Sequence, residues 1–423
     1  MSMPGVVSFE EARRIVEGHA GRAREAVAES RSFDTVDLNC ARGRALAEEL
    51  AADRDFPAFA RATRDGYAVR ASDVERVPAR LELIGEIKAG DSGDSFSVRA
   101  GQAVSIMTGA PLPAGADAVV MVEYTAEIPP GSGSSQSTAS GGRNIEIQRS
   151  VKTGENFVPR GAEARAGDVL IEAGRRLDHS LIAIAAAVGR SRVRVFRRPR
   201  VAVLATGDEL VEVGVTPGPA QIRNSNSYSL AAQVEEAGGE AVRLAIAPDE
   251  VGRLRELIEE GLSCDLLLLS GGVSMGKFDL VERVLGELGA ELYFTGARIQ
   301  PGKPVVFGSC ARRYFFGLPG NPVSTMVTFR LFARPLIAAL AGALPEPLAF
   351  LKARLKAEVR TKTGLTRFLP AVISGEFTES EVELAAWQGS GDIAALARAN
   401  CYLVVPPDRE RIPTGEMVSV LLP

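Results

Sequence analysis

Asp265-Leu-Leu-Leu-Leu-Ser-Gly-Gly-Val-Ser-Met-Gly-Lys-Phe-Asp279 is the stretch that decides the fold of this chain. Its four consecutive leucines predict a strand buried on both faces, because a half-exposed strand would alternate apolar and polar residues. Gly271 and Gly272 then let the backbone approach a ligand closely, and Asp279 is placed to cap a following helix. This order is typical of a parallel α/β sheet, which binds ligands at the carboxyl ends of its strands. Taken alone, the turn fits an oxyanion site and an ordinary helix cap equally well.

Length and composition exclude several classes of protein. A chain of 423 residues suggests roughly three domains. The net charge of −4 argues against a general nucleic-acid binder. Residues 8–14 open a charged helix and lack the apolar core of a signal peptide, and no apolar run approaches the roughly 20 residues that span a bilayer. The four cysteines share no metal-ligand spacing, and a reducing cytoplasm fits them best. From the charge, the apolar runs and the cysteines together, we expect a cytoplasmic protein that binds neither membrane nor nucleic acid.

Histidine chemistry has little support in this sequence. His19 and His179 are the only two histidines, and each is expected to be a solvated or capping residue. A histidine-based triad or zinc site is therefore disfavoured. Catalysis should rest on carboxylates, lysine or arginine, backbone amides and a magnesium ion.

The rest of the chain changes pattern several times. Residues 8–30 predict one amphipathic helix, and a second helix is expected around residues 45–50. Residues 81–122 carry short β-rich segments, which suggest a small β domain, and residues 129–142 form a Ser/Gly-rich tract that we interpret as a flexible loop. The final block, residues 346–423, again predicts a β domain.

From Val201 onward, strand and helix alternate with a regularity that predicts a parallel sheet. Polar loops interrupt this alternation at residues 206–209, 224–226, 249, 270–272, 301–303 and 318–322. Their convergence at one edge of the sheet would suit a nucleotide-like phosphate ligand with a divalent cation. Asp65 precedes Gly66 upstream, and by itself this pair is best interpreted as an ordinary turn.

An ordered set of motifs carries a resemblance to a known family. The chain resembles the MoeA family of molybdopterin molybdenumtransferases, which is similar to the E domain of gephyrin. The matching motifs are Arg64-Asp-Gly-Tyr-Ala-Val69, Thr108-Gly-Ala-Pro-Leu-Pro-Ala-Gly-Ala-Asp-Ala-Val-Val120, Thr206-Gly-Asp-Glu-Leu210, Ser270-Gly-Gly-Val-Ser-Met-Gly276, Pro301-Gly-Lys-Pro304 and Gly317-Leu-Pro-Gly-Asn-Pro-Val-Ser324.

The resemblance implies a multidomain α/β plus β protein. It implies a central parallel α/β domain like that of MogA and MoaB, an elongated linking domain, an inserted small β domain and a C-terminal β-barrel-like domain. We expect the following bounds: residues 1–30 and 187–345 for the α/β domain, 31–51 and 161–186 for the linking domain, 52–160 for the inserted domain and 346–423 for the C-terminal domain.

The resemblance also implies a reaction and its partners. The reaction is insertion of molybdate into adenylylated molybdopterin with release of AMP, assisted by Mg2+. The resemblance further implies a homodimer, and a MogA-like adenylyltransferase is a candidate partner.

Site residues are carried over by position in the matching motifs. The catalytic residues implied are Asp65, Glu209, Asp249 and Asp279, of which Asp249 and Asp279 would hold the metal. The substrate-binding residues implied are Thr108, Gly271, Gly272, Ser274, Lys303, Pro319, Gly320, Asn321, Arg367 and Ser390.

The chain departs from the family where positive charge is usual. Val158 stands in place of an arginine, and Gly296 and Gln300 stand where lysines are common. These departures leave open which residues bind the oxyanion, and whether that oxyanion is molybdate or tungstate. How the adenylylated intermediate is delivered also stays open.

Proteins of the MogA and CinA type share the α/β domain alone, so a molybdopterin adenylyltransferase or nucleotide pyrophosphatase is the alternative. The segments around Asp65 and Thr108, which those proteins lack, discriminate against it.

Overall fold

The computed structural model describes residues 5–128, 143–272, 280–376 and 379–422. The chain divides into two compact units, which are described separately below. The first unit comprises Met1–Glu48, Ala173–Ala183 and Ser191–Pro423, and the second comprises Glu49–Glu172 and Ile184–Arg190. The four-domain division and its bounds stay a prediction.

The first unit is built on a six-stranded sheet. Its strand order is β17 (Glu240–Arg243), β14 (Arg200–Ala205), β18 (Leu266–Ser270), β23 (Arg313–Leu318), β22 (Val306–Cys310) and β19 (Glu291–Phe294). The prediction of a parallel sheet is confirmed for the first four strands and is wrong at the other edge, where β22 runs antiparallel to both neighbours. A two-residue connection, Ala311-Arg312, joins β22 to β23, and so short a link can join only antiparallel strands.

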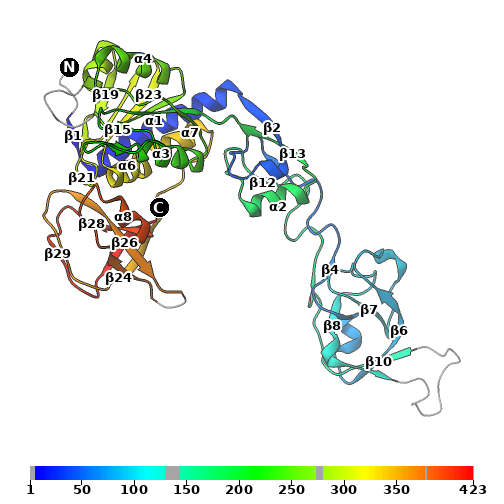
Figure 1. Ribbon diagram of the computed structural model, residues 1–423. Helices are drawn as coiled ribbons and strands as arrows, with labels where there is room; N and C mark the ends of the chain where they lie inside the picture. Colours follow the sequence, from blue (N-terminus) through cyan, green and yellow to red (C-terminus); the bar gives the residue numbers. More distant parts are fainter. Residues whose placement is uncertain (1–4, 129–142, 273–279, 377–378, 423) are drawn as a thin grey trace, which may run out of the picture. The chain divides into compact units, whose positions relative to one another are not determined.

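The leucine strand is buried on both faces, as predicted. Leu266 and Leu268 point into one apolar core, whereas Leu267 and Leu269 point into another. The first core is covered by α1 (Phe9–Ser30), α3 (Ser225–Glu236), α6 (Pro322–Thr328), η5 (Phe329–Ala333) and α7 (Arg334–Leu340). The second is covered by α4 (Val251–Gly261) and α5 (Leu280–Glu287), so the sheet lies between two helical layers (Figure 1).

The predicted N-terminal helix is α1. The Oγ atom of Ser8 accepts a hydrogen bond from the backbone N–H of Glu11 at 3.1 Å, which caps the first turn. His19 on this helix is not the solvated residue that we expected, because its ring lies 3.9 Å from that of Tyr293 and burial lowers the pKa of His19 to about 4. The helix expected around residues 45–50 is absent, because Ala45 and Leu46 form β-bridges with Arg176 and Val195.

The C-terminal region is a closed barrel of five strands, which confirms the expected β-barrel-like domain. The strands are β24 (Phe350–Leu355), β26 (Thr366–Ser374), β27 (Glu381–Leu384), β28 (Cys401–Val405) and β30 (Met417–Leu421). The pairing of β26 with β28 closes the ring. β21 (Ile299–Gln300), from the loop after β19, pairs with the start of β26, and α8 (Ile393–Arg398) precedes β28.

The second unit contains another six-stranded sheet. Its order is β8 (Ala118–Met121), β5 (Gly66–Val69), β7 (Gln102–Ile106), β6 (Ala79–Ile87), β10 (Arg143–Ile147) and β9 (Thr125–Ile128). The sheet confirms the expected small β domain; the Ser/Gly-rich tract at 129–142 lies outside the described residues. Apolar residues from its strands form two cores, one on each face.

Short elements complete the chain. The paired strands are β1 (Val6–Val7) with β20 (Gly296–Ala297), β2 (Phe33–Asp37) with β13 (Arg192–Phe196), β3 (Leu50–Ala51) with β12 (Val169–Ile171), β4 (Arg61–Ala62) with β11 (Phe157–Val158), β15 (Leu210–Val211) with β16 (Ile222–Arg223), and β25 (Val359–Arg360) with β29 (Arg411–Ile412). Helix α2 spans His179–Ala187.

One segment corrects the statement that no apolar run approaches bilayer length. Residues 322–340, which form α6, η5 and α7, are long and apolar enough to cross a membrane by length and composition alone. Within the protein, 67% of an apolar 18-residue window in this segment is buried, and the segment supplies much of the first core, as a core helix would.

Candidate functional site

Three parallel strands end side by side and bring their loops together. The backbone N–H of Thr206, after β14, donates to the Ser270 carbonyl at 3.0 Å, and the N–H of Gly271 donates to the Leu318 carbonyl at 3.2 Å. Gly271 has a φ of +94°, and a Cβ atom there would lie 2.6 Å from the Thr206 carbonyl oxygen. The predicted glycine turn therefore requires glycine for both backbone conformation and space.

Asn226 ties these loops to helix α3, and the sequence analysis did not single it out as a site residue. Its Nδ2 donates to Ser270 Oγ at 2.9 Å and to the Gly320 carbonyl at 2.7 Å, whereas its buried Oδ1 has no partner among the described residues. The signal available in the sequence was the polar run at 224–226, in which Asn224 caps the helix. One amide thus holds the turns after β18 and β23 in register.

Three carboxylates, those of Asp208, Glu209 and Asp249, gather at the same edge. Asp208 Oδ1 accepts a hydrogen bond from the Asp249 backbone N–H at 3.0 Å. Partial burial raises the pKa of Asp249, and the negative charges of Asp208 and Glu209 raise it further. No described residue forms an ion pair with any of the three. Among the described residues, no group of three acidic, histidine or cysteine side chains is close enough to hold a metal unaided. The predicted metal ligand Asp279 and the predicted Ser274 lie outside the described residues.

The start of α6 joins the sheet edge to the barrel region. Asn321 precedes the helix, and its Nδ2 donates to Ser390 Oγ at 2.9 Å. The N–H of Val323 also donates to the Ser390 carbonyl at 3.1 Å. Of the predicted residues before this helix, Pro319 is buried and Gly320 is exposed. Asn321 and Ser390, predicted as separate ligands, are therefore direct neighbours.

A second contact to the barrel involves Arg367. This side chain is 6% exposed; its Nε donates to Gln300 Oε1 at 2.8 Å and its Nη1 to the Leu365 carbonyl at 3.1 Å. Loss of hydration on burial lowers the pKa of Arg367, and no described carboxylate pairs with it. Lys303, three residues after Gln300, is exposed.

The departures from the family have structural counterparts. Gly296 in β20 pairs with Val6 in β1. A Cβ atom at position 296 would lie 3.0 Å from a methyl group of Val6 and 3.1 Å from the Lys303 carbonyl oxygen. Val158 pairs with Arg61 in the second unit. Gln300 offers Arg367 an uncharged acceptor where a lysine would bring a second positive charge.

Asp65 and Thr108 meet in the second unit. Asp65 Oδ1 accepts hydrogen bonds from the backbone N–H of Thr108 at 2.7 Å and from its hydroxyl at 2.8 Å. These bonds lower the pKa of Asp65, so this exposed carboxylate stays ionised. A Cβ atom at Gly66 would lie 1.9 Å from the Val120 carbonyl oxygen, so the turn that presents Asp65 requires glycine.

In chemical terms, the sheet edge combines a glycine turn, amide and hydroxyl groups, and carboxylates that form no ion pair with a described residue. The glycine turn with its amide and hydroxyl groups suits the oxygens of a phosphate or a polar ring, and the carboxylates suit a hard divalent cation.

Comparisons with known proteins cover nearly the whole chain. Three family models match: "MoeA N-terminal region (domain I and II)" over residues 7–189, "Probable molybdopterin binding domain" over 202–339 and "MoeA C-terminal region (domain IV)" over 352–422. A curated molybdopterin molybdenumtransferase from Nostoc sp. is 35% identical over 401 residues, which cover 92% of this chain and 88% of the relative. The molybdopterin molybdenumtransferase of Bacillus subtilis is 34% identical over 90% of this chain and 87% of the relative.

A solved structure agrees with these matches. The crystal structure of the molybdopterin biosynthesis MoeA protein from Pyrococcus horikoshii OT3 is 28% identical, has a TM-score of 0.75, and covers 99% of this chain and 100% of that one. Because the matches include the N-terminal and C-terminal regions, they extend beyond the single domain on which the adenylyltransferase alternative rested. The chain belongs to the MoeA family of molybdenum cofactor biosynthesis.

Proposed function

We propose that this protein is a molybdopterin molybdenumtransferase that inserts molybdate into adenylylated molybdopterin and releases AMP. The observation that carries the proposal is the convergence of the loops after β14, β18 and β23, fixed by the two hydrogen bonds of Asn226. A ligand that combines a polar ring system with a pyrophosphate requires such a set of donors beside acidic residues.

The carboxylates support a role for Mg2+ as cofactor. Asp208, Glu209 and Asp249 supply the oxygen donors that magnesium prefers, and partial burial, together with the negative charges of Asp208 and Glu209, raises the pKa of Asp249. Magnesium keeps several waters or substrate oxygens in its shell, so it does not require a complete protein cage. When bound, it would neutralise charge on the pyrophosphate.

The protein's own groups would orient the substrate. Asn226 fixes the two turns through its hydrogen bonds to Ser270 and Gly320. Asn321 offers an amide and Ser390 a hydroxyl beside the same loops. Arg367 has a positive charge with only neutral hydrogen-bond partners among the described residues, which suits it to attract a dianion such as molybdate.

Further parts of the proposal concern assembly and location. We place the enzyme in the cytoplasm as a homodimer that receives its intermediate from a MogA-like adenylyltransferase. The four cysteines are free, which agrees with a reducing compartment.

The test is an assay with purified protein, adenylylated molybdopterin, MgCl2 and molybdate, in which released AMP is followed by chromatography. We expect AMP release to require both molybdate and magnesium. Molybdate-independent AMP release at the same rate would instead identify a pyrophosphatase.

A further inference from the structure

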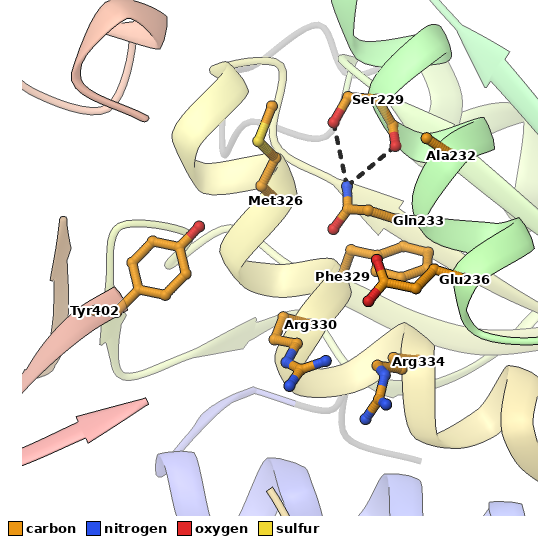
Figure 2. A pocket seen from close by; sticks show the side chains of 9 residues that line it. All are labelled: Ser229, Ala232, Gln233, Glu236, Met326, Phe329, Arg330, Arg334 and Tyr402. Atoms are coloured by element: carbon orange, nitrogen blue, oxygen red, sulfur yellow. Dashed lines mark hydrogen bonds between the residues drawn. The ribbon is translucent and has the colours of Figure 1, made fainter. Parts of the chain in front are cut away.

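A cavity of about 260 Å³ lies between α3, the helical segment from α6 to α7 and the barrel strand β28. Figure 2 shows Arg330 and Arg334 side by side along one wall, Glu236 above them and Tyr402 on the other side. Met326 and Phe329 supply apolar surface. None of these residues is assigned to the proposed reaction.

The two arginines each have one donor atom without a hydrogen-bond partner among the described residues. The Nε atoms of Arg330 and Arg334 are both buried, and neither has an acceptor within the described part of the chain. Buried donors are nearly always paired in proteins, so two adjacent unpaired guanidinium donors call for an acceptor from outside the chain. Burial lowers the pKa of Arg330, and the neighbouring charge of Arg334 adds to this effect.

The charges around the cavity leave a positive excess. Arg334 Nη2 lies 3.7 Å from a carboxylate oxygen of Glu346, and Arg176 Nη2 donates to the Glu236 backbone carbonyl at 2.9 Å. Among the side chains that line the cavity, Arg330 and Arg334 are positive and Glu236 is negative, so the lining has one positive charge in excess. An anion entering the cavity would balance it.

Tyr402 adds a directed donor. Its side chain is buried, and loss of hydration raises the pKa of Tyr402 to about 12, so the hydroxyl keeps its proton at neutral pH. No described residue hydrogen-bonds to this hydroxyl. It leaves a donor free across the cavity from the arginines (Figure 2).

We propose that this cavity binds a small organic anion, with one phosphate or carboxylate group held by Arg330, Arg334 and Tyr402 and an apolar body against Met326 and Phe329. Helix α3 lines this cavity from Ser229 to Glu236 and carries Asn226 in its first turn. The inference does not depend on the proposed reaction.

The test is isothermal titration of the full chain with two probes, phenyl phosphate and benzoate. We expect at least one probe to bind, and Arg330→Met to weaken that binding at least about tenfold, because a charge-assisted hydrogen bond is lost. Tyr402→Phe should weaken it about two- to tenfold. Arg253→Met, which removes an exposed arginine on α4, is the matched control and should leave the affinity unchanged. Tighter binding of phenyl phosphate than of benzoate would assign the anionic group as phosphate, and the reverse order would assign it as carboxylate.

Three results would overturn the proposal. The first is binding of neither probe, or equal affinity in wild type and Arg330→Met. The second is binding that Asn321→Ala abolishes and Arg330→Met does not, since the probe would then occupy the sheet-edge site. The third is a change in sedimentation coefficient for Arg330→Met with probe binding unaltered, which would mean that a second copy of the chain covers the cavity. Arg330→Gln is a second variant if the methionine form fails to fold by circular dichroism.

Discussion

Arg367→Gln is the change that tests most directly how this protein holds its oxyanion. Arg367 is 6% exposed, and it donates to Gln300 and to the Leu365 carbonyl, both of which are uncharged. Its positive charge therefore has no compensating carboxylate among the described residues. Glutamine removes that charge and keeps a side chain able to hydrogen-bond.

The expected loss of molybdate binding in Arg367→Gln follows from Coulomb's law. Two unit charges about 4 Å apart attract by about 4 kcal/mol at an effective dielectric constant of 20. Molybdate carries two negative charges, and desolvation of the ion and the arginine cancels a large part of the gain. A net loss of about 2–3 kcal/mol corresponds to a rise of about 30- to 150-fold in the molybdate concentration for half-maximal turnover.

The assay measures AMP release against molybdate at a fixed, saturating concentration of adenylylated molybdopterin. Arg298→Gln is the control, because Arg298 is an exposed arginine two residues before Gln300, and we expect it to change half-saturation less than threefold. Lys303→Ala, run in parallel, should also raise the molybdate requirement.

An unchanged molybdate dependence in Arg367→Gln, with a raised requirement for the adenylylated substrate, would refute this reasoning. Arg367 would then be a phosphate or pterin ligand, and the oxyanion would have to be held elsewhere.

Three further changes test other parts of the site. Asp249→Asn should abolish AMP release yet raise the free energy of unfolding at pH 7 in magnesium-free buffer. Folding raises the pKa of the Asp249 carboxyl, so wild-type stability falls as the pH rises from the ordinary carboxyl pKa through the pKa of the folded protein. The stability gained by the asparagine variant should therefore vanish below the ordinary carboxyl pKa. Asn226→Ala loses two hydrogen bonds of about 1 kcal/mol each, so kcat/KM should fall about 30-fold while circular dichroism stays unchanged; a loss of less than threefold would show that the turns hold themselves. A homodimer could build each site from Asp65 of one subunit and Glu209 of the other. Asp65→Asn and Glu209→Gln should then each be inactive, and a mixed dimer with one subunit of each variant should recover activity. A mixed dimer without activity would place both residues in the same subunit's site.

Local patterns in the sequence were sufficient for the centre of the fold. Leu266–Leu269 predicted a strand buried on both faces because four apolar residues in a row leave no polar face, and residues 8–30 kept helical periodicity with a capping serine. The antiparallel β22 was missed because alternation of strand and helix was extended past the point where Ala311-Arg312 leaves no room for a crossover.

Contacts between distant residues explain the other differences. Leu46 forms its bridge with Val195, so the helical propensity of residues 45–50 is overridden by a partner far along the chain. His19 packs against aromatic rings from β19 and β23, and its burial lowers the pKa of the imidazole. Asn226 meets Ser270 and Gly320, 44 and 94 residues away, and nothing in its immediate neighbours distinguishes it from an ordinary helix-start asparagine.

The closed ring of β24, β26, β27, β28 and β30 has a consequence for assembly. Each of these strands has a neighbour on both sides, so the described ring contains no edge strand to which another chain could add. A second subunit that docks on the barrel must therefore recognise side chains. Its affinity can then be altered by single surface substitutions without disturbing the strands themselves, and the barrel is protected from the edge-to-edge association that leads β proteins to aggregate.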